Sequence, residues 1–275
     1  PPPTFFTYTA TTEIYTLYKS SAASVVYKRQ TVDSTNAEAL RRFASGQAAP
    51  FWVIAKLQTA GRGRRGRAWS SPEGNFAASL LITPEADPAE WALRSYAASL
   101  ALVEALGSCG VAEDRLSLKW PNDVLLDGRK LAGILLETAP PALAIGIGVN
   151  LAAMPAEEDI EPGALVPATL RNDLGIALNP EALLTHLAPA LAARDCMLRT
   201  DGFAPLRAAW LARATGLGQP ATARLPGREI TGRMVGIDAA GALKLETGDD
   251  LLRLPAAELH FGPAAESEES HAARH

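Results

Sequence analysis

The residues best suited to chemistry lie in one short basic segment of the chain. Residues 61–67 read Gly-Arg-Gly-Arg-Arg-Gly-Arg, and no acidic side chain lies among them. A planar guanidinium pairs with a carboxylate or a phosphate through two parallel hydrogen bonds and stays charged at physiological pH, while glycine lets the backbone approach a ligand and change conformation. The segment therefore predicts a mobile lid over a ligand that carries a carboxylate or a phosphate. A basic surface loop that binds nucleic acid is the alternative.

The spacing of Gly61, Gly63 and Gly66 also fits the dinucleotide-binding pattern G-x-G-x-x-G, after a strand-like segment at residues 51–57. That pattern requires a helix directly after the glycines, since the helix N-terminus binds the pyrophosphate. Residues 68–75 read Ala-Trp-Ser-Ser-Pro-Glu-Gly-Asn, which is typical of turns. No Gly-Lys-Ser or Gly-Lys-Thr closes the segment, so both the Rossmann and the P-loop interpretations fail.

A second group of reactive side chains surrounds a predicted hairpin. Residues 119–123 read Lys-Trp-Pro-Asn-Asp, which places a cation, an aromatic ring and two oxygen-bearing side chains at the end of a strand. Lys130 starts the return strand, and Gly133 leaves room for a ligand against the backbone. Each feature has an ordinary alternative: a common turn, an edge-strand charge and a bulge. Together with the arginine segment they favour a binding site.

Strands and helices alternate around these two groups. Strand patterns occur at residues 51–58, 76–82, 117–120, 124–126, 131–136 and 143–149, and helical patterns at residues 88–106, 180–198 and 202–214. Residues 33–38 are typical of a helix start, where Thr35 and Glu38 have the spacing of a capping box. Asp127-Gly128 predicts a tight hairpin turn. Because hairpins join some strands and helices join others, the predicted fold class is α+β and not doubly wound.

The pattern changes after Gly216-Leu217-Gly218. Short alternating segments at residues 221–225, 229–238, 242–246 and 251–254 are separated by turn sequences such as Pro226-Gly227, which predicts a small all-β barrel and a boundary near Thr215. The sequence thus predicts a poorly ordered leader at residues 1–22, a large domain at 23–215 that carries the reactive residues, a barrel at 216–262 and a disordered tail at 263–275.

The composition restricts the class of protein. A hydrophobic fraction of 48% provides enough apolar residues for a core, and a formal net charge of −4 argues against a protein that lives on DNA or on an acidic membrane. Cys109 and Cys196 form no disulfide pattern, and the four histidines have no metal-ligand spacing. The chain has no 18-residue apolar run and no signal peptide, so we expect a cytoplasmic protein and no membrane partner.

Five motifs, taken in order and spacing, resemble those of the biotin protein ligases. They are Asp33 to Asn36, Gln58 to Trp69, Lys119 to Asp123, Gly128 to Leu135 and Ile145 to Asn150. The resemblance covers roughly residues 25–260, and five ordered motifs are far more specific than any one of them. It implies a catalytic domain like that of the class II aminoacyl-tRNA synthetases, with a mixed sheet and helices, followed by a small SH3-like barrel.

The resemblance also implies a reaction in two steps. The carboxylate of biotin attacks the α-phosphate of MgATP and gives biotinyl-5′-AMP and pyrophosphate; a lysine of a biotin carboxyl carrier protein domain then attacks this mixed anhydride. The carrier domain belongs to a biotin-dependent carboxylase such as acetyl-CoA carboxylase, and biotin, ATP and Mg²⁺ are the expected small molecules. No enzyme nucleophile is required, and the sequence shows none in a nucleophile motif. A homodimer is left open.

Site residues are carried over from the matching motif positions. Biotin is expected to contact Ser34, Thr35, Asn36, Gln58, Gly61, Arg62, Gly63, Arg64, Lys130, Gly133 and Gly146. The nucleotide is expected to contact Arg62, Arg64, Arg65, Trp69, Lys119, Asn122 and Asn150, and Asp123 is the candidate ligand of Mg²⁺. Lys130 and Arg64 are the expected catalytic residues, because a cation near the reacting carboxylate and phosphate stabilises the transition state. Trp69 and Trp120 are expected either to line the pocket or to pack in the core.

The chain departs from the family pattern at two places. Many biotin protein ligases carry an N-terminal winged-helix domain that binds DNA, and the residues before Val32 are too few for one, so we expect a monofunctional ligase that does not bind DNA. Residues 163–166 offer only glycine and aliphatic side chains where some relatives place an aromatic residue over the adenine. The alternatives are a lipoate ligase, against which the full arginine segment argues, and a sensor that binds biotin or its adenylate without turnover.

Overall fold

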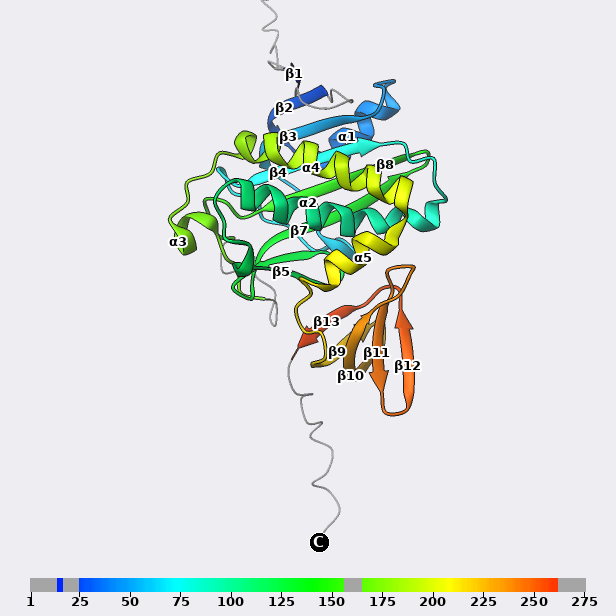
Figure 1. Ribbon diagram of the computed structural model, residues 1–275. Coiled ribbons are helices and arrows are strands. Elements are labelled where there is room, and N and C mark those ends of the chain that lie inside the picture. The colour runs from blue at the N-terminus through cyan, green and yellow to red at the C-terminus, as the bar shows by residue number, and fades with distance from the viewer. Residues whose placement is uncertain (1–13, 17–24, 156–164, 262–275) are drawn as a thin grey trace, which may run out of the picture. The chain divides into compact units, whose positions relative to one another are not determined.

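The computed structural model of the protein describes residues 14–16, 25–155 and 165–261 (Figure 1). The predicted leader at residues 1–22 lies outside the described residues except for β1 (Ile14–Thr16), and the predicted tail at residues 263–275 lies outside them entirely. None of the helices in the described part of the chain is long and apolar enough to cross a membrane. The fold comprises two compact units, a first with Pro1–Glu85, Leu135–Pro162 and Thr169–Pro180, and a second with Ala86–Ile134, Gly163–Ala168 and Glu181–His275.

An eight-stranded sheet has the strand order β1-β2-β3-β4-β8-β7-β6-β5. Besides β1, its strands are β2 (Val25–Val32), β3 (Phe51–Gln58), β4 (Phe76–Ile82), β5 (Leu116–Lys119), β6 (Asp123–Leu126), β7 (Arg129–Ala139) and β8 (Ala142–Val149). β2 and β3 pair in parallel, whereas the pairs β3–β4, β4–β8, β5–β6 and β6–β7 are antiparallel. The mixed sheet confirms the α+β class, and β2 is a strand that the sequence analysis does not predict.

In the first unit, helix α1 (Thr35–Ala44) connects β2 to β3 and packs on β3, β4 and β8. A parallel pair of strands requires such a crossover. The core beneath α1 consists of Tyr27, Ala39, Phe51, Val53, Leu81, Ala142 and Ala144. The rings of Tyr27 and Phe51 meet edge to face with their centroids 5.6 Å apart, which is a favourable aromatic arrangement. A short helix, α3 (Leu170–Leu174), also belongs to this unit.

The second unit contains α2 (Arg94–Ser108), α4 (Pro180–Asp201) and α5 (Phe203–Leu211). The helix predicted at residues 88–106 starts with the 3₁₀ turn η2 (Pro88–Leu93), whose cap Asp87 accepts a hydrogen bond from Ala89 N–H at 2.8 Å. Arg94 is 2% exposed and its Nε lies 2.9 Å from a carboxylate oxygen of Asp195 on α4. A buried cation requires such a partner, so this pair holds α2 against α4.

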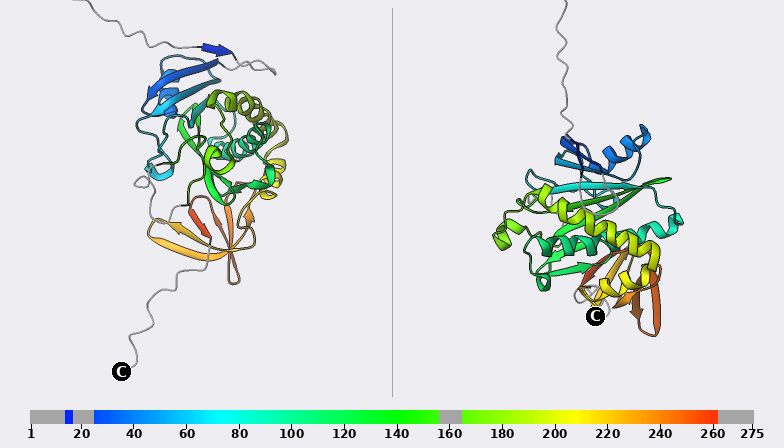
Figure 2. Two further views of the ribbon diagram at one scale, coloured as in Figure 1. Left: turned by 90° about the vertical axis from the view of Figure 1, so that its left-hand side faces the viewer. Right: turned by 45° about the horizontal axis from the view of Figure 1, so that its top comes forward.

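The second unit also contains a five-stranded antiparallel sheet with the order β12-β11-β10-β9-β13, drawn in orange and red in Figure 2. Its strands are β9 (Pro220–Leu225), β10 (Arg228–Ile237), β11 (Leu243–Thr247), β12 (Asp250–Leu254) and β13 (Glu258–Phe261). The predicted small β domain is thus confirmed, and β13 is an addition. The carbonyl oxygen of Gly241 accepts hydrogen bonds from Tyr96 Oη at 2.5 Å and Trp120 Nε1 at 3.2 Å, which attach this sheet to α2 and to the turn after β5.

Two local predictions have opposite outcomes. The hairpin at Asp127-Gly128 is confirmed, since both residues have positive φ angles of 49° and 76° and join β6 to β7. The prediction of a capping box at Thr35 and Glu38 is wrong. Ser34 occupies the N-cap position of α1, the Thr35 hydroxyl bonds to other strands, and the Glu38 carboxylate is taken by arginines such as Arg29 and Arg42. Gln58 and the two arginines therefore take the place of the predicted capping bonds.

Candidate functional site

The first cluster of predicted site residues lies in the first unit, where β2 leads into α1. Ser34, Thr35 and Asn36 are polar, yet they are only 4%, 4% and 3% exposed. Ser34 takes the N-cap position with an extended backbone, and α1 begins at Thr35. Because a buried polar side chain costs free energy unless it is hydrogen-bonded, these residues require partners from neighbouring strands.

Two strands supply partners for Thr35 and Asn36, through Gln58 at the end of β3 and Ser79 in the middle of β4. Gln58 Oε1 accepts a hydrogen bond from the Thr35 N–H at 2.8 Å and lies 3.1 Å from Thr35 Oγ1. Ser79 Oγ lies 2.7 Å from Thr35 Oγ1 and 2.6 Å from Asn36 Oδ1. We call Ser34, Thr35, Asn36, Gln58 and Ser79 the first cluster.

Ser79 is the member of this cluster that the sequence analysis misses. β4 reads Phe-Ala-Ala-Ser-Leu-Leu-Ile, so its hydroxyl is the one polar side chain in an apolar strand, and the residue is fully buried. Such a hydroxyl must find a hydrogen-bond partner, which is the signal that could have singled it out. Its partners lie more than 40 positions away in the sequence, so only the fold identifies them.

Gly146 on β8 lies directly against the Asn36 carboxamide. A Cβ atom at Gly146 would be 2.6 Å from Asn36 Oδ1 and 2.9 Å from Asn36 Nδ2, closer than van der Waals contact allows. The Nδ2 group also donates a hydrogen bond to the carbonyl oxygen of Leu135 at 3.3 Å. The missing side chain at Gly146 therefore makes room for Asn36, while the expected approach of a ligand to Gly146 stays a prediction.

The glycine–arginine segment forms a closed loop in the first unit. The Trp69 N–H donates to the Gly61 carbonyl at 2.9 Å, and the Gly63 N–H donates to the Arg67 carbonyl at 2.7 Å. Between these bonds lies the 3₁₀ turn η1 (Arg64–Gly66). A Cβ atom at Gly61 would be 2.4 Å from the Trp69 carbonyl oxygen. Gly61 is thus required for the closure of the loop itself, a role that the sequence analysis does not assign.

Side chains of this loop contact two strands of the first unit. Arg62 Nη2 lies 3.1 Å from Glu137 Oε1 on β7, and the Arg62 side chain is 44% exposed. An exposed ion pair of this kind contributes little free energy, so an anionic ligand can replace the carboxylate at low cost. Trp69 packs on Gly148 of β8, where a Cβ atom would lie 2.5 Å from the indole ring. The loop thus carries a cation with an exchangeable partner.

Asn150 follows β8 in the first unit and is 4% exposed, and its carbonyl oxygen accepts a hydrogen bond from the Leu170 N–H at 3.2 Å. The neighbouring turn is held by Asn75, whose Oδ1 accepts from the backbone N–H groups of Ala152 and Ala153 at 2.9 and 3.0 Å. These bonds fix the backbone at the end of β8, where the sequence analysis expects the nucleotide.

Charged residues surround the start of α1. Arg41 Nη2 lies 2.7 Å from a carboxylate oxygen of Asp33, the residue that precedes Ser34, and it also contacts Glu38 at 3.2 Å. The hydrogen bond from Arg41 holds the pKa of the Asp33 carboxyl well below its usual range, and Asp33 in turn raises the pKa of the Arg41 guanidinium. Both side chains are about half exposed, so this pair orients the residues before α1 more than it stabilises the fold.

The second cluster lies in the second unit, on β5, β6 and β7 and in the turn between β5 and β6; its members are Lys119, Asn122, Asp123, Lys130 and Gly133. Lys119 pairs with Asp123 across β5 and β6, and Asp123 pairs with Gly133 across β6 and β7. The Lys130 ammonium lies 2.9 Å from Asp123 Oδ1, which is an ion pair. The predicted cation and the predicted carboxylate are therefore brought together.

A β-bulge decides that Lys130 and Asp123 share one face of the sheet. The register of β6 and β7 shifts between Val124, which pairs with Ala132, and Leu125, which pairs with Lys130. Successive side chains of a strand point to opposite faces, so without the extra residue Lys130 would face the other way. The bulge re-aims the lysine, and no sequence signal of the chain predicts it.

Asn122 and Trp120 hold the backbone around the second cluster. Asn122 Nδ2 donates to the Ile134 carbonyl at 2.6 Å, and the Ile134 N–H donates to the Asn122 carbonyl at 3.0 Å. Trp120 is 1% exposed, and its Nε1 donates to Tyr96 Oη at 2.9 Å and to the Gly241 carbonyl. Of the two expectations for Trp120, core packing is confirmed.

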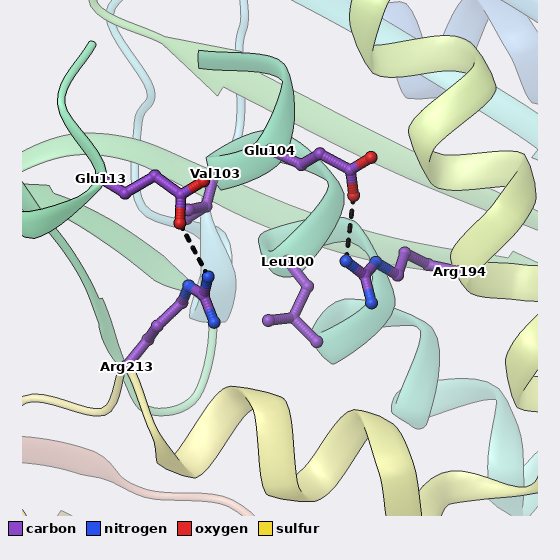
Figure 3. A pocket seen from close by; sticks show the side chains of 6 residues that line it. All are labelled: Leu100, Val103, Glu104, Glu113, Arg194 and Arg213. Atoms are coloured by element: carbon purple, nitrogen blue, oxygen red, sulfur yellow. Dashed lines mark hydrogen bonds and ion pairs between the residues drawn. The ribbon is translucent and has the colours of Figure 1, made fainter. Parts of the chain in front are cut away.

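A pocket of about 250 Å³ in the second unit contains no predicted site residue (Figure 3). It is lined by Leu100, Val103, Glu104, Glu113, Arg194 and Arg213. Each arginine is paired with a glutamate, Arg194 with Glu104 at 3.0 Å and Arg213 with Glu113 at 2.9 Å. Balanced charges of this kind offer no net attraction to an anion, so the chemistry is to be sought in the two clusters.

Comparison with known proteins identifies the family of the chain. Residues 26–151 match the biotin/lipoate A/B protein ligase family, and residues 216–261 match the biotin protein ligase C-terminal domain. A biotin–[acetyl-CoA-carboxylase] ligase of Paracoccus denitrificans is 50% identical over 236 residues, which are 84% of this chain and 98% of that protein. The chain belongs to the biotin/lipoate A/B protein ligase family.

The chain is also similar in sequence and in structure to other members of the biotin/lipoate A/B protein ligase family. A biotin–[acetyl-CoA-carboxylase] ligase of Mycobacterium tuberculosis is 36% identical over 78% of this chain and 80% of its own length. The structure of a biotin protein ligase from Aquifex aeolicus in complex with biotin and ATP matches with a TM-score of 0.74 and 25% identity, over 86% of this chain and 98% of that one. The family fold thus extends over both compact units.

Proposed function

We propose that this protein is an ATP-dependent biotin protein ligase, which converts biotin to biotinyl-5′-AMP and transfers the biotinyl group to a lysine of a biotin carboxyl carrier protein domain. The observation that carries the proposal is the 50% identity to a biotin–[acetyl-CoA-carboxylase] ligase over 98% of that protein. The two clusters support it, because a neutral hydrogen-bonding cluster suits the ureido ring of biotin and a cationic cluster suits the carboxylate and the phosphates.

In the first step, an oxygen of the biotin carboxylate attacks the α-phosphorus of ATP, and the bond to the β-phosphate bridging oxygen breaks. Negative charge shifts from the carboxylate toward the leaving pyrophosphate. Lys130 and Arg64 are the proposed catalytic residues, since cations at the shifting charge stabilise the transition state. Lys130 exchanges Asp123 for the ligand in this proposal, and Arg62 likewise exchanges Glu137. In the second step, the acceptor lysine attacks the biotinyl carbonyl carbon as a free amine, AMP leaves, and the amide nitrogen loses a proton.

The remaining residues bind and orient the substrates in this proposal. Ser34, Thr35 and Gln58 bind the ureido ring, with Asn36, Gly61, Gly63, Gly133 and Gly146 close to biotin. Arg65, Trp69, Lys119, Asn122 and Asn150 are assigned to the nucleotide. The domain boundaries near residues 23, 215 and 262 also stay predictions, as does a cytoplasmic location. The aliphatic stretch at residues 163–166 lies partly outside the described residues, so the packing of the adenine is left open.

In this proposal, Mg²⁺ binds together with ATP and is not a resident ion of the protein. Across residues 14–16, 25–155 and 165–261, no group of three or more His, Cys, Asp or Glu side chains could hold a metal. Mg²⁺ in nucleotide sites is bound by phosphates, waters and one or two carboxylates, and the buried Oδ1 of Asp123 fits a single carboxylate ligand. The ion would neutralise phosphate charge, while Asp123 would fix its position.

Pyrophosphate release from MgATP with biotin, with lipoate or with no acid tests the proposal, followed by the mass of an added biotin carboxyl carrier protein domain. We expect biotin-dependent release and an acceptor that gains one biotinyl group. Release with lipoate alone would assign the protein to the lipoate branch of the family. Tight binding of biotin without any release would make it a sensor.

A further inference from the structure

We infer that Tyr96 on α2 is a positioning residue for adenylation, because its hydroxyl fixes the turn that carries Asn122 and Asp123 of the second cluster. Tyr96 is 4% exposed, and the sequence analysis assigns it no role in the site. The inference rests on the proposed function and adds to it a residue that acts through the protein backbone.

The Tyr96 hydroxyl bridges two groups whose hydrogen-bond directions are fixed. An indole N–H can only donate, and a backbone carbonyl can only accept. Trp120 Nε1 therefore donates to Tyr96 Oη at 2.9 Å, and Tyr96 Oη donates its own proton to the Gly241 carbonyl at 2.5 Å. The same indole N–H lies 3.2 Å from that carbonyl. The three groups thus form a closed set of hydrogen bonds, in which the hydroxyl makes the two shorter ones.

The surroundings fix both the Tyr96 ring and the Gly241 turn. The centroid of the Tyr96 ring lies 5.1 Å from that of Phe203 and 5.4 Å from that of Trp210, both on α5, and such tilted and edge-to-face pairs are favourable. The Gly241 turn is closed by Asp238, whose Oδ1 accepts two backbone N–H groups at 2.9 Å. A Cβ atom at Gly241 would lie 2.8 Å from the tyrosine ring. The hydroxyl therefore has a fixed position, against which the indole is held.

The turn between β5 and β6 is held from two directions. Asn122 Nδ2 donates to the Ile134 carbonyl on β7 at 2.6 Å, and the Trp120 indole bonds to α2. Asp123 directly follows this turn and starts β6. The Lys130 ammonium lies 2.9 Å from Asp123 Oδ1, so the place of the turn also decides where the carboxylate meets the proposed catalytic lysine.

Loss of the hydroxyl should move this turn. The Trp120 N–H would retain only its longer contact with the Gly241 carbonyl among these bonds, and a buried donor without a good acceptor costs free energy. The indole, which is 1% exposed, should then shift toward the carbonyl and displace the residues that follow it. A misplacement of about 1 Å can cost up to about 100-fold in rate. We therefore expect a loss of activity that exceeds the loss of stability.

Tyr96→Phe tests the inference, since it removes the hydroxyl and keeps the ring. We expect kcat for biotin-dependent pyrophosphate release, at saturating biotin and MgATP, to fall about fivefold or more, as for one lost hydrogen bond. The calorimetric Kd for biotin alone should stay within about twofold, because the ureido ring is proposed to bind the first cluster. Trp120→Phe removes the donor of the same bond and should lower kcat in the same way; it replaces Tyr96→Phe if that variant does not fold.

Trp210→Phe is the matched control, because Trp210 is 1% exposed and packs on the Tyr96 ring without taking part in this set of hydrogen bonds. It removes more atoms than Tyr96→Phe and should cost at least as much stability in urea unfolding, yet it should leave kcat within about twofold. If Trp210→Phe lowers kcat as much as Tyr96→Phe does, Tyr96 only supports the packing and the inference is wrong.

A double-mutant cycle with Asp123→Ala tests the path of the effect. If Tyr96 positions Asp123, Tyr96→Phe should lower kcat less in the Asp123→Ala background than in the wild-type protein. An equal decrease in both backgrounds would mean that Tyr96 acts elsewhere, and would overturn the inference. A wild-type protein that releases no pyrophosphate with biotin would instead overturn the proposed function, and the inference with it.

Discussion

Ser79 is fully buried among hydrogen-bond partners, whereas the Lys130 side chain is 32% exposed beside the carboxylate of Asp123. The first cluster contains hydroxyls and amides that bond to one another, and the second contains an ion pair on two neighbouring strands. Neutral polar groups can be buried when each finds a partner, but full burial of a charge costs much more, so the lysine that we propose to bind a ligand stays near water.

The difference between the two clusters suggests separate roles in ligand binding and in the reaction. Directional hydrogen bonds in a rigid, buried cluster discriminate between ligands of similar shape. An ion pair discriminates less, but a lysine that is 32% exposed can exchange its carboxylate partner for a ligand during a reaction. We therefore expect changes in the first cluster to affect biotin binding, and changes in the second cluster to affect the rate of adenylation.

Lys130→Ala should have the largest effect. Loss of one charge-stabilising donor costs about 100- to 1,000-fold in rate, so we expect a decrease of that size in kcat for biotin-dependent pyrophosphate release. The variant also leaves the largely buried Asp123 carboxylate without this cation, so we expect a loss of stability of about 1–3 kcal/mol, between the values for exposed and for fully buried ion pairs. Lys244→Ala on β11, another half-buried lysine on a strand, is the control. A full-rate Lys130→Ala enzyme would remove the lysine from the catalytic residues.

Gly146→Ala should break the first cluster without touching the second. The new Cβ atom would lie 2.6 Å from Asn36 Oδ1, and overpacking of this kind costs about 1–3 kcal/mol of stability. Displacement of Asn36 should raise the KM for biotin about tenfold and leave the KM for ATP within about twofold, as for the loss of one hydrogen bond. In Gly107→Ala, the Cβ atom meets its nearest neighbour at 3.6 Å, so this control should be neutral. Equal rises in both KM values would contradict the proposal that the first cluster binds biotin and not ATP.

Asp123→Asn distinguishes a Mg²⁺ ligand from a simple partner of Lys130. As a ligand, its loss should raise the Mg²⁺ concentration for half-maximal pyrophosphate release about tenfold, the lower range for altered metal sites. As an ion-pair partner, its loss should leave the Mg²⁺ dependence unchanged. Titration of MgCl₂ at saturating ATP and biotin separates the two cases.

Asp33→Asn should have the smallest effect and shows whether charge matters near the first cluster. Arg41 lowers the pKa of Asp33 in the folded protein, so the pair stabilises the fold above the unfolded-state pKa of about 4, and this contribution disappears as the pH falls through the lowered folded value. Near neutral pH the variant should lose less than about 1 kcal/mol.

Urea unfolding at several pH values from neutral to strongly acidic measures that difference, which should shrink on acidification. Asp114→Asn, in the exposed 3₁₀ turn η3 (Glu113–Arg115), is the control. A pH-independent difference would mean that Asp33 acts through the backbone bond from the Ser34 N–H at 2.7 Å and not through its charge.

Much of the fold follows from local patterns in the sequence. The apolar run at residues 76–82 is a strand as predicted, and Asp127-Gly128 forms the predicted hairpin, because both depend on side-chain periodicity and turn conformations within a few residues. The resemblance over five motifs also identified the family. Elements such as β13, whose four residues carry no strong alternation, required pairing with β9 to form.

The sequence by itself determined which reactive residues the chain carries and which segments become strands and helices. The tertiary structure alone decided how those residues are arranged. The bulge in β7 turns Lys130 toward Asp123, the contact with Gly146 confines Asn36, and the pairing of β4 with its neighbours brings Ser79 to Thr35. The physical reason is that sheet faces, close contacts and hydrogen-bond partners depend on residues far apart in the sequence, and no local pattern specifies them.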